Sequence, residues 1–272
     1  MKPAFYSFII VSLLLVSCVS VRKTTDTPPF NSNDRLLMAV AWFQHSAEME
    51  ALYFQGFNIA TQRLDEAVAA SNGAGNLAVV VDIDETMLDI SPHMTTVIQS
   101  GDTPAAWTAW VEKSKAKALP GALEFANYAQ SKKVSIFYIS NRKASERIAV
   151  LKNLRKEGFP FADDDHLLTR DDLSFSTGDT SSKEGRRIKV AVNYDIILLI
   201  GDNLSDFAID FEDRSVNNGK EAVETNRAQF GKKLIILPNP MYGTWEKPLL
   251  EYKDGLSAEE KTRLIKAKLK AE

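Results

Sequence analysis

The sequence predicts an α/β fold built on an open, largely parallel β-sheet. Its first support is a set of short apolar runs without polar alternation, at residues 77–81, 134–139, 196–200 and 233–237. Continuous apolar strands are typical of parallel sheets that helices cover on both faces. The second observation is a helical pattern over residues 145–156. Gly158 and Pro160 mark the end of this helix. Strands that alternate with helices indicate βαβ units.

The N-terminal part of the chain differs from the rest. Residues 4–16 form an apolar run that is short for a membrane span and has the length of a secretory signal core. The run leads into Leu-Val-Ser-Cys at residues 15–18, and Cys18 is the only cysteine, so no disulfide forms within the chain. This stretch resembles a bacterial lipobox, which implies a signal peptide over residues 1–17 and a lipid on Cys18. The alternative is an ordinary signal peptide with a chance cysteine.

The next segments lead from this leader into the folded domain. Residues 18–33 are rich in Thr, Pro, Ser and Asn, which predicts a flexible tether. The folded domain is predicted over residues 34–250. It begins with a long helix, capped by Asp34 and running to about residue 70, because apolar residues recur there at helical spacing.

The C-terminal segment, residues 251–272, is predicted to be helical. Ser257 and Glu260 match a capping box, in which each side chain bonds to the backbone N–H of the other residue. Its many lysines are most simply a solvated face.

The charge of the chain limits its ligands. The formal net charge is −3, so no basic surface for nucleic acid is indicated. An anionic substrate would need positive charge placed locally. His45, His93 and His166 are scattered without ligand spacing, which argues against a zinc site.

Two groups of carboxylates follow apolar runs. Asp82 and Asp84 come directly after the first run, and Asp202 and Asp206 come after the third. Ligands of open α/β sheets bind beyond the carboxyl ends of the strands, so we expect these residues to meet at one edge. A solvated turn is the alternative for Asp82 and Asp84 taken alone. Four carboxylates in one place need a cation, and oxygen ligands select a hard ion such as Mg²⁺.

Other polar residues complete a site for an anionic group. Ser140 follows the second run and offers a hydroxyl, and Lys183 offers a full positive charge. A phosphate held between a metal ion, Lys183 and the donors around Ser140 would explain how an acidic protein binds an acidic substrate. Lysines mostly lie at the surface, so a plain surface lysine is the alternative for Lys183.

Four motifs occur along the chain in a fixed order: DIDET, Ser-Asn-Arg after a strand, a separate lysine, and GDNLSD. They resemble the four motifs of the haloacid dehalogenase (HAD) superfamily of phosphohydrolases. Within it, the chain resembles the class C, nonspecific acid phosphatases, bacterial surface lipoproteins also described as 5′-nucleotidases. The stretches that carry this resemblance include residues 42–48, 82–92, 107–110, 120–122, 140–143, 201–207 and 238–246. Ile83, where Leu is frequent, and Ser140, where Thr is also common, depart from the pattern without removing a required group.

The resemblance implies an HAD-like Rossmannoid parallel sheet flanked by helices, with a small, mainly helical cap from residues 34–75 and about 90–125. It implies a Mg²⁺-dependent acid phosphatase acting on phosphomonoesters, such as nucleoside 5′-monophosphates and aryl phosphates. It also implies a protein of the bacterial cell envelope, anchored through Cys18 and sorted to the outer membrane. The oligomeric state stays open, a homodimer included.

The resemblance also implies roles for the motif residues. Asp82 is expected to attack phosphorus and form an aspartyl-phosphate, and Asp84 to donate and then accept a proton. Ser140 and Lys183 are expected to stabilise charge on the transferring phosphoryl group. The expected ligands of Mg²⁺ are Asp82, the backbone carbonyl of Asp84, Asp202, and Asp206 directly or through water.

Four further residues are expected to contact the substrate. Asn141 and Arg142 lie in the Ser-Asn-Arg motif beside the phosphate site. Trp107 and Tyr242 occupy places where the family stacks aromatic rings on the leaving group, and stacking suits broad specificity. The alternative for both aromatic residues is an ordinary place in the core or cap.

Two other functions compete with a phosphatase. A phospho-receiver module also combines acids, a Ser or Thr and a Lys, but such modules are shorter and cytosolic and lack the second Asp of Asp-x-Asp. A non-catalytic, divalent-ion-binding surface lipoprotein is the other alternative. The stretch from Asp82 to Met87 lacks the glycine of an EF-hand loop and follows an apolar strand, which argues against that kind of site.

Overall fold

The computed structural model describes residues 32–73, 75–172 and 181–271. They belong to one compact unit, residues 31–272. The predicted signal peptide, Cys18 and nearly all of the predicted tether lie outside the described residues. None of the helices in the described part of the chain combines the length and the apolar character that a membrane crossing requires.

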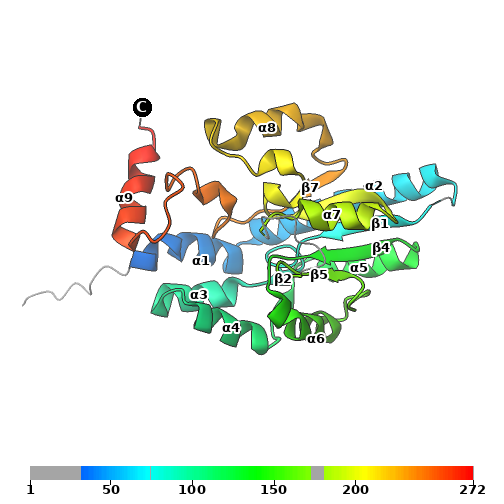
Figure 1. Ribbon diagram of the computed structural model, residues 1–272, viewed down its shortest axis with the longest axis horizontal. Coiled ribbons are helices and arrows are strands. Elements are labelled where there is room, and N and C mark those ends of the chain that lie inside the picture. The colour runs from blue at the N-terminus through cyan, green and yellow to red at the C-terminus, as the bar shows by residue number, and fades with distance from the viewer. Residues whose placement is uncertain (1–31, 74, 173–180, 272) are drawn as a thin grey trace, which may run out of the picture. The chain divides into compact units, whose positions relative to one another are not determined.

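A five-stranded parallel sheet in the order β5-β4-β1-β6-β7 forms the centre of this unit (Figure 1). In that order the strands are β5 (Leu167–Leu168), β4 (Ser135–Ile139), β1 (Leu77–Val81), β6 (Asp195–Gly201) and β7 (Leu234–Ile236). The four predicted strands are confirmed to within one residue at each end. β5 was not predicted, because two residues are too few to form a pattern. The predicted α/β class is therefore confirmed.

Helices and short 3-10 turns connect the strands. The α-helices are α1 (Leu37–His45), α2 (Ala47–Ser71), α3 (Ser91–Ser100), α4 (Pro104–Glu112), α5 (Ala122–Ser131), α6 (Arg147–Glu157), α7 (Glu184–Ala191), α8 (Lys220–Thr225) and α9 (Ala258–Lys268). The 3-10 turns are η1 (Ser32–Leu36), η2 (Ala144–Glu146), η4 (Leu204–Asp206), η5 (Ile209–Phe211), η6 (Asn217–Gly219), η7 (Arg227–Gln229) and η8 (Thr244–Glu246). A small antiparallel pair, β2 (Leu88–Asp89) with β3 (Lys117–Ala118), lies outside the main sheet.

Both faces of the sheet are covered. Val79 and Val81 of β1 belong to one buried cluster, which also contains side chains of α2 and α5. Ala78 and Val80 point the other way, into a second cluster that includes Val190 of α7. Because successive strand residues face opposite sides, burial on both sides requires an apolar residue at every position. This is the physical reason for the continuous apolar runs.

The long helix predicted from Asp34 to about residue 70 is wrong as a single helix. Between α1 and α2 lies Ser46, whose backbone is extended (φ −85°, ψ 136°). The Ser46 Oγ accepts a hydrogen bond from the Met49 N–H at 3.1 Å. A serine in this position satisfies one of the N–H groups that a helix start leaves free. The helix therefore restarts at Ser46, and Asp34 lies in η1.

The predicted capping box at the C-terminal helix is confirmed. Ser257 Oγ accepts from the Glu260 N–H at 3.2 Å, and Glu260 Oε2 accepts from the Ser257 N–H at 2.8 Å. The helix that follows, α9, is shorter than the predicted segment of residues 251–272.

The helices predicted for a cap take two different positions. α2 packs on the sheet, in contact with β6, β7 and α5. At Gly56 the packing is so close that an added Cβ would lie 2.5 Å from Leu237 Cδ2. α4 instead contacts α6 and η2, and residues of α3 and α4 line a cavity at the carboxyl ends of the strands. The division of the chain into a core and a cap stays a prediction.

The strand register brings the predicted site residues to one edge of the sheet. Val81 of β1 pairs with Tyr138 of β4 on one side and with Ile200 of β6 on the other. The residues that follow these strand ends therefore leave the sheet at neighbouring positions. Asp82 is tied to this edge by its own N–H, which donates to the Ile200 carbonyl at 3.0 Å.

Candidate active site

A cavity of about 610 Å³ lies at this edge of the sheet. Its lining comes from the ends of β1, β4 and β6, from α3 and α4, and from the segment after β7. The predicted site residues among the lining are Asp82, Asp84, Trp107, Asn141, Arg142, Lys183, Asp202, Asp206 and Tyr242. Residues separated by more than a hundred positions in the sequence thus meet in one place.

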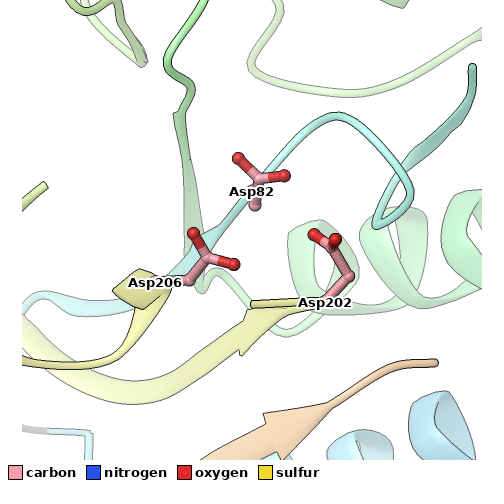
Figure 2. Close-up of side chains that lie close together, drawn as sticks. All are labelled: Asp82, Asp202 and Asp206. Atoms are coloured by element: carbon pink, nitrogen blue, oxygen red, sulfur yellow. The ribbon is translucent and has the colours of Figure 1, made fainter. Parts of the chain in front are cut away.

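Three carboxylates of the cavity lining lie close together (Figure 2). One oxygen each of Asp82, Asp202 and Asp206 lies within 4.8 Å of the others. Gly201 lets the Asp206 side chain pack against the backbone, because an added Cβ there would collide with Asp206 Oδ2. The same Asp206 oxygen accepts from the Asn203 N–H at 2.9 Å, which fixes the carboxylate within η4. We call Asp82, Asp202 and Asp206 the acid floor.

Lys183 is a cationic side chain that forms ion pairs with two residues of the acid floor, Asp82 and Asp206. Its Nζ contacts a carboxylate oxygen of Asp82 and lies 2.7 Å from Asp206 Oδ1. Its side chain is only 5% exposed. Burial opposes the charge of the lysine, but Asp206 and Asp82 outweigh that effect and raise the pKa of Lys183. Lys183 therefore stays positively charged in the cavity.

The charges of the acid floor are not balanced by Lys183 alone. Burial, and next Asp206 and Asp82, raise the pKa of Asp202 well above its ordinary value. Burial also raises the pKa of Asp82 to about 7, against the opposing effect of Lys183. Buried like charges that resist ionisation fit a bound cation, which would favour the ionised form of each carboxylate. The donor set consists of oxygens, which suits a hard divalent ion.

Two polar side chains orient Asp202. Thr86 Oγ1 donates to Asp202 Oδ1 at 3.2 Å, and Asn239 Nδ2 donates to Asp202 Oδ2 at 2.8 Å. Neither contact was predicted. Thr86 lies in the DIDET motif, and Asn239 follows β7 within the stretch 238–246 that carries the family resemblance. Both positions lie at the common edge of the sheet, which is the signal that could have indicated these contacts.

Asp84 lies apart from the acid floor and pairs with Arg142. Arg142 Nη2 lies 2.6 Å from Asp84 Oδ1, and Arg142 Nε lies 3.1 Å from both carboxylate oxygens. The guanidinium also lies over the ring of Trp107, with Cζ 5.4 Å from the ring centre. The Asp84 carboxylate is therefore part of the cavity wall. The predicted contact between the Asp84 backbone carbonyl and a metal ion stays a prediction.

Ser140 is fully buried at the end of β4. Its Oγ accepts from the Arg142 N–H at 3.1 Å, which leaves the hydroxyl proton able to donate to another group. Its neighbours Asn141 and Arg142 line the cavity. The roles predicted for Ser140 and Asn141 toward phosphate stay predictions.

Trp107 and Tyr242 both line the cavity and are partly buried. The rings of Trp107 and His93 pack in a T-shaped arrangement, with ring centres 5.1 Å apart. Both aromatic side chains thus form part of the cavity wall, and their predicted stacking on a leaving group stays a prediction.

Sequence reasoning missed two buried arginines that hold the site together. Arg186 donates to the Ser140 carbonyl and to Asn141 Oδ1, both at 2.6 Å. Arg187 donates to the Asp206 carbonyl at 2.9 Å. Both lie on α7, which begins directly after Lys183. Their spacing of three and four residues from Lys183 places them on the same side of a helix and is the signal that could have indicated them.

Glu85 is a buried acid whose contacts are structural in kind. Its Oε1 accepts from the Ile90 N–H at 3.0 Å, and its backbone carbonyl accepts from the hydroxyl of Tyr53. Its φ of 54° places it in the left-handed region. Asp89 accepts from the Ser91 N–H at 2.8 Å. Both acids support the turn between β1 and α3.

Comparisons with known proteins agree with this geometry. The sequence matches the family described as HAD superfamily, subfamily IIIB (acid phosphatase), over residues 13–245. The structure of the class C acid phosphatase from Bacillus anthracis is similar, with a TM-score of 0.81 and 42% sequence identity over 89% of this chain and 99% of that one. A second structure of the class C acid phosphatase from that organism, with tungstate bound, gives a TM-score of 0.79 and 42% identity over 88% of this chain and 98% of that one. The range that the family matches contains every residue of the cavity lining.

Proposed function

The chain belongs to the acid phosphatases of HAD subfamily IIIB and is a phosphomonoesterase, and on this premise we propose that it is a Mg²⁺-dependent enzyme of the cell envelope. Its proposed substrates are nucleoside 5′-monophosphates and aryl phosphates, and its proposed intermediate is an aspartyl-phosphate on Asp82. The observation that carries the proposal is the meeting of the acid floor and Lys183 in one cavity.

The acid floor supports a role in binding Mg²⁺. Asp82, Asp202 and Asp206 would supply carboxylate oxygens to the ion. When bound, Mg²⁺ neutralises charge on the phosphoryl oxygens. Asp82 then attacks phosphorus as its carboxylate, and the bond to the alcohol oxygen breaks as the bond to Asp82 forms. Lys183, which reaches Asp82 and Asp206, stabilises the negative charge of the phosphoryl group during this transfer.

Asp84 is placed to donate a proton in the first step and to accept one in the second. Its carboxylate faces the cavity and is not part of the acid floor. In the first step it gives a proton to the leaving alcohol, and in the second it takes a proton from the water that hydrolyses the aspartyl-phosphate. The cavity beyond it, with Trp107 and Tyr242 in its walls, has room for a leaving group larger than phosphate.

Phosphate release tests the reaction and the metal. We expect the purified chain to release phosphate from nucleoside 5′-monophosphates and p-nitrophenyl phosphate in Mg²⁺, to lose this activity in EDTA, and to recover it when Mg²⁺ is returned. A panel that includes sugar phosphates ranks the substrates. Full activity after exhaustive chelation contradicts the metal requirement. An absence of turnover in both conditions contradicts the phosphatase and favours a non-catalytic, ion-binding lipoprotein.

The proposed location rests on the leader. The stretch before Cys18 has the form of a lipobox, and Val19 rather than Asp follows it, by resemblance to enterobacterial sorting toward the outer membrane. We expect the wild-type chain to fractionate with the outer membrane and Cys18→Ala to be released from membranes. Continued membrane fractionation of Cys18→Ala contradicts lipid anchoring.

A further inference from the structure

The Arg142 side chain is only 2% exposed, yet it carries a full charge. A buried guanidinium is stable only when its charge is paired and its N–H groups are bonded. Asp84 provides that pair, through one short contact to Oδ1 and longer contacts from Nε. Burial opposes the charge on Arg142, but Asp84 outweighs it and raises the pKa of Arg142. The arginine is therefore held in place as a cation.

The two oxygens of Asp84 are held unequally. Oδ1 accepts from Nη2 at 2.6 Å and from Nε, whereas Oδ2 has, among the residues that the structure describes, only the shared Nε contact at 3.1 Å. Oδ2 is thus the oxygen that remains able to carry a transferable proton. Because a guanidinium is planar and its donors form a rigid fork, its orientation also sets the plane of the carboxylate.

Trp107 fixes the orientation of Arg142 from its other side. Its ring lies under the guanidinium, at a distance typical of a cation–π contact. The ring is itself held by His93, which packs against it at close to a right angle (73°). His93 in turn contacts Trp110 of the same helix, α4, with ring centres 6.2 Å apart. A row of packed rings therefore supports the guanidinium.

The backbone of Arg142 is anchored as well. Its N–H donates to Ser140 Oγ at 3.1 Å, and its carbonyl accepts from the Arg170 N–H at 2.9 Å. These bonds connect the residue to the ends of β4 and β5. With both backbone and side chain held, Arg142 has little freedom to leave Asp84.

We propose that Arg142 is a positioning residue that aims Asp84 Oδ2 at the oxygen of the leaving group, and that Trp107 acts through Arg142. The inference rests on the proposed role of Asp84 as the proton donor. In the step concerned, the bond between phosphorus and the alcohol oxygen breaks while the proton leaves Asp84 Oδ2 for that oxygen. A water proton returns to Oδ2 when the aspartyl-phosphate is hydrolysed.

This proposal predicts an effect that depends on the leaving group. A good leaving group such as p-nitrophenolate departs without a proton, whereas phenolate and alkoxides depart far more readily when protonated. Phenyl phosphate and p-nitrophenyl phosphate both carry one benzene ring, so stacking on an aromatic wall affects both alike. The ratio of their kcat/KM values therefore isolates proton donation from binding, because kcat/KM covers only the events up to departure of the leaving group.

Arg142→Lys keeps the positive charge but loses the planar fork. We expect it to lower kcat/KM for phenyl phosphate and nucleoside 5′-monophosphates by about 10² and for p-nitrophenyl phosphate by less than about 3-fold, since a general acid contributes roughly 10²–10⁴. Trp107→Leu, which keeps an apolar side chain without a ring, should change the same ratio in the same direction by about 10-fold. The matched control is Arg147→Lys, which disturbs an Arg–Asp pair outside the cavity, with Nη2 of Arg147 2.7 Å from Asp172 Oδ2. It should leave the ratio unchanged.

A double-mutant cycle tests whether Arg142 acts through Asp84. With Asp84→Asn already present, adding Arg142→Lys should lower kcat/KM for phenyl phosphate by less than about 3-fold, because residues that act as a unit are not additive. Full additivity overturns the proposal. So does an equal loss on both aryl phosphates in a variant whose thermal unfolding is unchanged. If the wild type releases no phosphate from either substrate, the proposed function fails; if the wild type is active and the ratio does not move, only this inference fails.

Discussion

The cavity contains two carboxylate–base groups, and they are balanced differently. In the acid floor, the carboxylates of Asp82, Asp202 and Asp206 lie together, and Lys183 is the one cationic side chain among the described residues that forms an ion pair with them. In the outer wall, one carboxylate, Asp84, faces one base, Arg142. The Asp82 and Asp206 side chains are 10% and 7% exposed, and that of Asp84 is 19% exposed, while Asp202 is partly exposed like Asp84.

This difference in charge balance separates the tasks of the two groups. The acid floor has an excess of negative charge in a buried place, which is a condition that a divalent cation relieves. The outer wall pairs one carboxylate with one guanidinium, so it holds no excess of negative charge for a metal ion to relieve. The floor is therefore suited to holding metal and phosphoryl group, and the wall to directing a proton.

Asp82→Asn is the change with the largest expected effect, because it removes the proposed nucleophile. We expect kcat to fall by more than about 10³-fold on every phosphate ester, the scale on which loss of a nucleophile acts. Phosphate release from phenyl and p-nitrophenyl phosphate measures it. If the variant lost activity on phenyl phosphate but kept it on p-nitrophenyl phosphate, Asp82 would be the proton donor and not the nucleophile.

The fold of this variant serves as its control. Asparagine has nearly the same shape as aspartate, and the change removes one of the mutually repelling charges in the floor. In EDTA, the thermal unfolding temperature of Asp82→Asn should therefore be no lower than that of the wild type. Turnover close to the wild-type rate would end the assignment of Asp82 as nucleophile.

Arg186→Lys should have a smaller effect on activity, because Arg186 touches no reacting atom. It joins the two sides of the cavity by bonds from α7 to the Ser140 carbonyl and the Asn141 side chain. Arg186 reaches these two acceptors with two different nitrogens, Nη1 and Nη2, whereas a lysine has all its donors on one nitrogen, so the loop at the end of β4 should shift. We expect kcat/KM to fall by about 10- to 100-fold with every leaving group, as misplacement of site groups by about 1 Å does.

Arg155→Lys is the matched control for this prediction. Arg155 also donates to a backbone carbonyl, that of Ala162 at 2.7 Å, but it lies on α6 and does not line the cavity. We expect its activity to equal that of the wild type. If Arg186→Lys behaved in the same way, the bonds from α7 would have no part in positioning the site.

The acid floor was predictable from the sequence to a degree that the outer wall was not. Asp82 and Asp202 directly follow strands, and a parallel sheet places strand ends at one edge whatever the loops do. The continuous apolar runs that identify those strands come from burial on both faces. The backbone positions of Asp82 and Asp202 thus follow from sheet geometry.

The outer wall depends on contacts that no spacing encodes. Arg142 was expected to contact substrate, and its pairing with Asp84 follows from the path of the loop after β4 and from the place of Trp107 on α4. The break at Ser46 was missed for a related reason. Helical periodicity continues across it, and only the cap bond to Met49 ends one helix and starts the next.

The smallest expected effect is a dependence of stability on pH in the metal-free protein. This dependence should come from the acid floor and not from the outer wall. In the metal-free fold the pKa of Asp82 is raised from 3.8 to about 7, and that of Asp202 is raised as well, both by burial first. For an acid whose pKa is higher in the folded state, the contribution to stability is complete below the unfolded pKa and is lost as pH rises through the folded pKa. In EDTA, stability should therefore fall between about pH 4 and about pH 7.

Bound Mg²⁺ should remove much of this dependence, because it favours the ionised carboxylates. The gap between unfolding temperatures in Mg²⁺ and in EDTA should widen as pH rises, by about 2–4 °C for each kcal/mol. Asp82→Asn in EDTA should show a flatter fall than the wild type, whereas Arg142→Lys, which leaves the floor intact, should follow the wild-type slope. A gap that stays constant from about pH 4 to about pH 7 would mean that the floor carboxylates hold no excess charge for a cation to relieve.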